Sequence, residues 1–219
     1  MSLIHRAPRI LKPISSQLIW EIESKGSDIY LTFDDGPHPE ITPWVLNELD
    51  KHNAKATFFL VGENAQRYPD IVKLIIEKGH HIGNHTFNHI QGWNTSAYKY
   101  YRNTLKCEQH FSSSLFRPPY GRITRAQYHR LAKRYRIIMW SVLSGDYDRK
   151  LLPAKIIKGV IHHTVPGSVI VFHDSVKAEK NLKESLPEVL NQLSAKGFIS
   201  KSIPYQLQNS TEVRGQGNA

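Results

Sequence analysis

The amino-acid sequence predicts an α/β fold, a distorted or incomplete (β/α) barrel of roughly seven or eight units in a single domain. Short runs rich in β-branched and aromatic residues alternate with longer segments of helical period. The run 56–61, ATFFLV, is almost wholly apolar, as in a parallel strand buried on both faces. Unusual polar residues follow the predicted strands, where the loops of a barrel build active sites. An open doubly wound sheet is the alternative.

Each element is placed by its own composition and by the residues that bound it. The predicted strands share apolar, β-branched or aromatic side chains over a short span, and they cover 29–33, 56–61, 81–84, 114–117, 136–140 and 168–172, with a last short strand beginning at Gly197. The predicted helices share apolar residues at helical spacing, and they cover 42–52, 68–78, 96–110, 124–135, 153–163 and 182–196. Gly79 ends the second helix, Thr124 caps the fourth, and Pro153 opens the fifth at its first turn.

We divide the chain into three parts. Residues 1–27 form an N-terminal extension whose segment 10–23, with Trp20, is expected to pack outside the barrel. Residues 28–205 form the barrel domain, and the polar tail 206–219 follows it.

Charge and cysteine content limit the classes of protein to consider. The net charge of +10 permits nucleic-acid binding, but the basic residues are scattered along the sequence, so no nucleic-acid partner is expected. A basic surface could equally help the protein to bind an anionic polymer such as a cell-wall glycan. The single cysteine, Cys107, excludes a disulfide framework within the chain. Without an apolar leader or a membrane-spanning run, the default expectation is a cytoplasmic monomer, although the compartment is not determined.

Two polar segments indicate a catalytic metal site. Asp34 and Asp35 are adjacent in TFDDGP, and because two neighbouring carboxylates repel each other, their presence suggests a function. The alternative is a structural turn, since Asp-Gly-Pro is common in turns. His85 and His89 in HTFNH are spaced i, i+4, which would place two imidazoles on one side of a helical turn. Two histidines and one carboxylate leave open positions on a metal, as catalytic sites require.

Three later segments also follow predicted strands. In RPPYG, the prolines stiffen the loop that carries Arg117 and Tyr120, although the same residues could form a rigid turn with a surface arginine. The segment WSVLSGDYD contains Asp146, and VFHD contains His173, which suits a general acid or, with the aspartate, a helix cap. Five such segments at five strand ends indicate one active site.

Together these segments resemble those of the polysaccharide deacetylase family, the NodB-homology or carbohydrate esterase family 4 domain, over roughly residues 28–198. The family fold is a distorted (β/α) barrel. The resemblance implies that Asp34 is the general base and that Arg117 orients it. It also implies that His173 is the general acid and that the Tyr120 N–H helps to form an oxyanion hole. By the same resemblance, the metal ligands are Asp35, His85 and His89.

The fourth segment departs from the family pattern. The family has an Asp-x-x-Asp-Trp-like run there, and in this chain Leu143 stands for the first aspartate and Tyr147 for the tryptophan. Asp146 is the best match for the residue that steadies the catalytic histidine, with Asp148 second. This departure bears on substrate preference more than on activity.

The implied function is a metal-dependent hydrolase that removes N-acetyl groups from amino sugars of a glycan such as peptidoglycan or chitin and releases acetate. The implied cofactor is a divalent ion, Zn²⁺ before Co, Ni or Mn. The alternatives are a C–N hydrolase acting on a small amide or ureide and a glycan-binding module without catalysis. Four aromatic residues could stack on a sugar ring, although aromatics more often fill the core, and they are Trp93, Tyr120, Tyr147 and Phe172.

Overall fold

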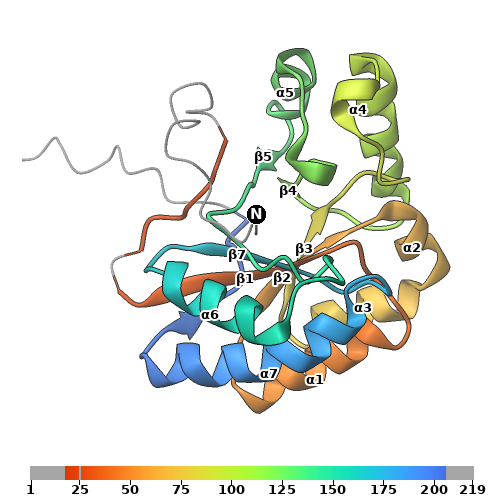
Figure 1. The fold of residues 1–219 in the computed structure, drawn as a ribbon. Coiled ribbons are helices and arrows are strands. Elements are labelled where there is room, and N and C mark those ends of the chain that lie inside the picture. The colour runs from red at the N-terminus through yellow and green to blue at the C-terminus, as the bar shows by residue number, and fades with distance from the viewer. Residues whose placement is uncertain (1–17, 25, 206–219) are drawn as a thin grey trace, which may run out of the picture.

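A curved sheet of eight parallel strands forms the centre of the computed structural model, which describes residues 18–24 and 26–205 (Figure 1). The strand order is β5-β4-β3-β2-β1-β7-β6, and β8 pairs with the start of β1. The strands are β1 (Asp28–Asp34), β2 (Ala56–Leu60), β3 (His81–Asn84), β4 (Leu115–Phe116), β5 (Arg136–Ile137), β6 (Val142–Leu143), β7 (Val169–His173) and β8 (Ile199–Ser200). The fold is therefore the expected incomplete barrel and not an open doubly wound sheet.

Seven α-helices of the described chain cover this sheet. They are α1 (Ile41–Lys51), α2 (Gly62–Arg67), α3 (Pro69–Glu77), α4 (Ala97–Lys106), α5 (Arg125–Leu131), α6 (Pro153–His163) and α7 (Glu179–Ala195). Figure 1 shows α1, α3, α6 and α7 side by side along β1, β2 and β7, whereas α4 and α5 stand together beside β4 and β5. The main core lies between the first group of helices and the sheet, where Phe33 stacks on Phe58 and on Phe172.

The element predictions differ from the structure mainly at the sheet edges. The strand predicted over 136–140 is shorter in the structure, where β5 covers two residues and is followed by a bridge at Ile138. Strand β6 was not predicted. A two-residue strand carries no periodicity, and β6 exists because it pairs with β7. Helix α2 was also missed, since it has six residues and follows β2 without a polar cap.

The N-terminal segment joins the barrel more closely than expected. Ile19 forms a parallel bridge with Ile138, and Glu21 forms an antiparallel bridge with Ser168, the residue before β7. Ile22 is buried against Tyr30 and Val169. Residues 19–22 thus connect the residue after β5 with the residue before β7. Residues 1–17 and 25 of the extension and the tail 206–219 lie outside the described residues, so the division into parts stays a prediction.

The parallel register gathers the strand ends at one edge of the sheet. Asp34 at the end of β1 lies opposite His173 at the end of β7, and Asn84 at the end of β3 lies opposite Phe116 in β4. His85 and Arg117 therefore leave their strands side by side. Across residues 18–24 and 26–205, none of the helices has the length and apolar content needed to cross a membrane.

Candidate active site

A buried ion pair between Asp34 and Arg117 lies at the base of the site. Arg117 is fully buried, and its Nη1 donates to Asp34 Oδ1 at 2.6 Å and to Thr32 Oγ1 at 2.7 Å. Its Nη2 and Nε donate to the carbonyl oxygens of Met139 and Ile138 at 2.9 and 3.3 Å. These bonds fix one carboxylate oxygen of Asp34 and leave Oδ2 directed toward the site, 4.0 Å from His85 Nε2.

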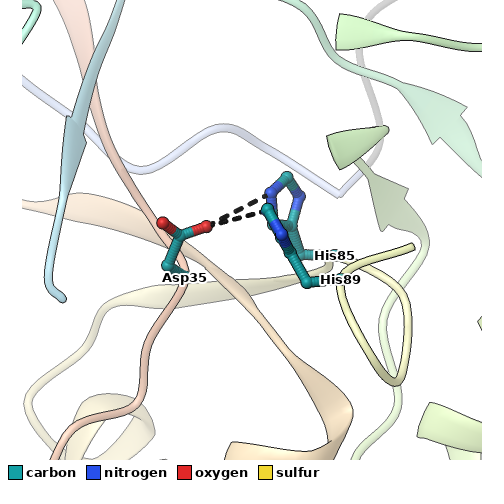
Figure 2. Close-up of side chains that lie close together, drawn as sticks. All are labelled: Asp35, His85 and His89. Atoms are coloured by element: carbon teal, nitrogen blue, oxygen red, sulfur yellow. Dashed lines mark ion pairs between the residues drawn. The ribbon is translucent and has the colours of Figure 1, made fainter. Parts of the chain in front are cut away.

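Three further side chains converge beside this pair. Asp35 Oδ1 lies 3.1 Å from His89 Nε2 and 3.7 Å from His85 Nε2, and the three side chains offer ligand atoms that all lie within 4.8 Å of one another. Figure 2 shows the carboxylate pointing at both imidazoles. Burial alone would raise the pKa of Asp35, but the hydrogen bond with His89 and the nearby histidines hold it well below its ordinary value.

The protonation of these groups suits a divalent ion. His85 Nδ1 donates to the Arg117 carbonyl oxygen at 2.8 Å, which leaves the Nε2 lone pair facing Asp35. Burial lowers the pKa of His85 to about 4, so the ring is neutral at pH 7. A neutral imidazole whose other nitrogen is held by a carbonyl is the usual form of a histidine ligand.

The two histidines converge for a different reason from the one expected. The segment after β3 is a loop and not a helical turn, so the i, i+4 helical argument was wrong. Asn84 Oδ1 accepts from the Thr86 N–H at 2.9 Å, and Thr86 and His89 both adopt positive φ angles of 64° and 53°. This tight loop brings the two ring centroids to 5.1 Å.

His173 faces the same site from β7. Its Nδ1 donates to Asp146 Oδ1 and its backbone N–H donates to Asp146 Oδ2, both at 2.8 Å. Burial is the largest single influence on His173 and lowers its pKa, but Asp146 together with Asp35 and Asp34 outweighs burial and raises the pKa to about 9. Asp146 is thus the partner of the histidine, while Asp148 is exposed and makes no ion pair with a described residue. Tyr147 packs edge-on against the His173 ring at 5.2 Å.

Tyr120 lies beside His89, in a short 3-10 helix η4 (Pro119–Gly121). Its φ of 59° turns the backbone, and no described residue accepts a hydrogen bond from its N–H. Its ring is 60% exposed and packs edge-on against His89 at 4.7 Å. The geometry leaves the N–H able to donate to a ligand.

Sequence reasoning missed several buried polar residues that hold the site. Thr32 accepts from Arg117 and donates to the Ile170 carbonyl at 2.8 Å; a polar residue inside an apolar strand was the signal for it. Asn181 of α7 donates to the carbonyl oxygens of Asp146 and Asp148 at 3.1 and 2.9 Å, and it carries no local signal.

Asp174 forms a second buried support. It accepts from the Gly36 N–H at 3.1 Å and from Thr42 Oγ1 at 2.5 Å, so it connects β7 with the loop after β1. Burial raises the pKa of Asp174 to about 8. The alternative that Asp174 caps a helix was wrong, because α7 begins at Glu179 and Asp174 instead supports the loop after β1.

The four aromatic candidates separate into two groups. Phe172 is fully buried and stacked in the core, so it cannot contact a sugar. Trp93 is 63% exposed, Tyr120 is similarly exposed, and Tyr147 is partly exposed beside His173.

Comparison with known proteins shows which proteins this chain is similar to. The polysaccharide deacetylase family model matches residues 21–137. A peptidoglycan-N-acetylglucosamine deacetylase of Bacillus cereus is 36% identical over 194 residues, covering 85% of this chain and 70% of the relative. A chitooligosaccharide deacetylase of Azorhizobium caulinodans is 33% identical over 202 residues, covering 84% of this chain and 96% of the relative.

A solved structure gives the same result for the fold. The crystal structure of the Bc1960 peptidoglycan N-acetylglucosamine deacetylase, in complex with 4-naphthalen-1-yl-N-oxidanyl-benzamide, superposes with a TM-score of 0.84 at 33% identity. The match covers 92% of this chain and 99% of that one.

Proposed function

The chain belongs to the polysaccharide deacetylase family, and from this premise we propose how it works and which glycan it takes. It is a hydrolase that cleaves the C–N bond of N-acetyl groups on amino sugars. Water and the acetamide group react to give acetate and a free amine. The proposed substrate is peptidoglycan, with N-acetylglucosamine as the deacetylated unit, supported by the relatives and by the net charge of +10.

The observation that carries the mechanism is the placement of a base and an acid around one ligand set. Asp34 Oδ2 accepts the proton of the attacking water, because Oδ1 is occupied by Arg117. His173 Nε2 gives a proton to the departing amine, because Nδ1 is occupied by Asp146. A protonated His173 at neutral pH fits this role, since its pKa is raised to about 9.

The tetrahedral intermediate needs donors for its oxyanion. The Tyr120 N–H supplies one such donor, and losing a donor of this kind typically costs about 10²–10³ in rate. Asp35, His85 and His89 would hold the metal ion, and Zn²⁺ suits two imidazoles and one carboxylate. When bound, such an ion polarises a carbonyl and lowers the pKa of water.

The exposed rim favours a polymer over a small amide. Trp93 and Tyr120 stand open to solvent on neighbouring loops, whereas a small-molecule site would be closed over its ligand. A binding module without catalysis would not need the buried Arg117–Asp34 and Asp146–His173 pairs.

The test measures acetate release from N-acetylglucosamine oligomers and from peptidoglycan, with added Zn²⁺ or Co²⁺ and with a chelator. We expect chelator-sensitive release from both and faster release from peptidoglycan. His85→Ala should abolish release, while His81→Ala, a control at the other end of β3, should retain it. No release from either glycan by the metal-loaded protein would refute the proposal.

A further inference from the structure

Beside the metal ligands, the loops after β3 and β4 run next to each other and carry an exposed tryptophan and an arginine. The first contact between them is that of Tyr120 with His89, at 4.7 Å between ring centroids. Further along, Gly92 touches the Arg122 backbone so closely that a Cβ there would lie 2.2 Å from the Arg122 carbonyl oxygen. The last contact is that of the Arg122 guanidinium with the Trp93 ring, at 4.9 Å.

These loops are fixed by a buried glutamine. Gln127 of α5 is fully buried, and its Nε2 donates to the carbonyl oxygens of Gly92 and Thr95, both at 2.8 Å. Its Oε1 accepts from the Thr124 N–H at 2.9 Å. Gln127 therefore fixes the backbone on both sides of Trp93. The short helix η2 (Gly92–Asn94) thus presents the Trp93 ring on a rigid backbone.

Trp93 and Arg122 form what we call the Trp93–Arg122 platform. The Trp93 side chain is 63% exposed, so its burial contributes little to the stability of the fold. An exposed aromatic ring on a rigid loop is typical of a binding surface. Among the described residues, no carboxylate pairs with the Arg122 guanidinium, so its charge is free for a ligand. An arginine held against an aromatic ring keeps its outer N–H groups for a carboxylate.

The platform lies close to the reacting centre along the chain. Trp93 is four residues beyond His89, and Arg122 is two residues beyond Tyr120, so each is at most roughly 7–14 Å along the chain from the site. A glycan whose acetamide group reaches the centre would continue onto it.

We propose that the Trp93–Arg122 platform is a substrate subsite that selects a neighbouring sugar whose substituent bears a carboxylate, as a free lactyl group or a stem peptide of peptidoglycan does. Trp93 packs on the apolar face of the sugar, and Arg122 pairs with its carboxylate. This inference rests on the proposed deacetylase function and adds the feature that distinguishes acidic strands from neutral chitin-type oligomers.

The test compares kcat/KM for acetate release on three substrates: neutral N-acetylglucosamine oligomers, soluble peptidoglycan strands, and the same strands with amidated carboxyl groups. Arg122→Gln should lower kcat/KM on the acidic strands about three- to tenfold, chiefly through KM, as expected for a lost charge-assisted hydrogen bond. It should leave the neutral and amidated substrates within roughly twofold of wild type. Trp93→Ala should weaken all three, because stacking does not depend on charge.

The matched control is Arg130→Gln, since the Arg130 guanidinium also lies over an aromatic ring, that of Tyr101 at 5.8 Å, but on the exposed part of α5. It should change none of the three values. An equal loss on neutral and acidic substrates for Arg122→Gln, or no loss on either, would overturn the subsite. A wild-type protein that releases acetate from no substrate would instead overturn the deacetylase function, and the subsite with it.

Discussion

Replacing Asp146 by asparagine should release His173 from its raised pKa. In the wild-type protein both oxygens of Asp146 accept from His173, at 2.8 Å each, and the carboxylate is fully buried. Asparagine keeps the shape and one acceptor but removes the charge. Burial of His173 then acts with less opposition, and we expect its pKa to fall from about 9 to near or below the ordinary 6.5.

The size of this change also predicts a pH-dependent stability. A folded-state pKa of about 9 exceeds the ordinary value of 6.5, so protonated His173 stabilises the folded state. This contribution is fully present below pH 6.5 and is lost as the pH rises through 9. The difference corresponds to about 3 kcal/mol. Asp146→Asn should therefore be less stable than wild type at pH 6.5, and the gap should narrow above pH 9.

The assay is an NMR titration of the His173 ring in chelator-treated protein, paired with urea unfolding at pH 6.5 and 9.5. Asp148→Asn is the matched control. It removes a carboxylate charge two residues after Asp146, and the Asp148 side chain accepts only from the Lys150 N–H. The control should leave the His173 pKa in place. An unchanged pKa in Asp146→Asn, or an equal fall in both variants, would refute the reasoning.

Four other substitutions have definite expected outcomes. Asp34→Asn should retain bound metal and lose at least about a hundredfold in turnover, as for a missing general base, whereas His85→Ala should lose both; metal content after dialysis and acetate release distinguish them, and metal loss from the first variant would contradict the assignment. Gly36→Ala should lower stability by about 1–3 kcal/mol, because the added Cβ would lie 2.1 Å from Asp174 Oδ2; an unchanged thermal midpoint would contradict this. Arg117→Lys should cost about 3 kcal/mol in urea unfolding, since an ammonium cannot replace the four hydrogen bonds of the buried guanidinium; a loss below about 1 kcal/mol would show that lysine suffices.

The sequence predicted those parts of the molecule that local pattern determines. Helix α6 has an apolar stripe and a proline at its first turn, so its bounds Pro153–His163 match the prediction. The gathering of Asp34, His85 and His173 could be anticipated because the carboxyl ends of parallel strands share one edge. Their catalytic roles stay predictions.

What the sequence could not predict depends on contacts between distant residues. Asn181 lies 35 positions from Asp146, and only the packing of α7 against the barrel brings its amide to that loop. Strand β6 is defined by its pairing with β7. The platform at Trp93 depends in the same way on Gln127, 32 positions beyond Thr95.

The backbone of the site supports the view that rigidity serves the chemistry. Five described non-glycine residues have positive φ angles, and four of them, Asp35, Thr86, His89 and Tyr120, lie in the loops of the site. Such conformations cost of order 1–3 kcal/mol each and persist only where surrounding contacts enforce them. The enforcing contacts are the buried polar bonds described above, including the bond that the Thr86 N–H donates to Asn84 Oδ1. The strained loops at this edge of the sheet therefore lower the stability of the fold, but they hold a carboxylate, two imidazoles and a backbone N–H in fixed positions. Hydrolysis of an unreactive amide requires such fixed groups.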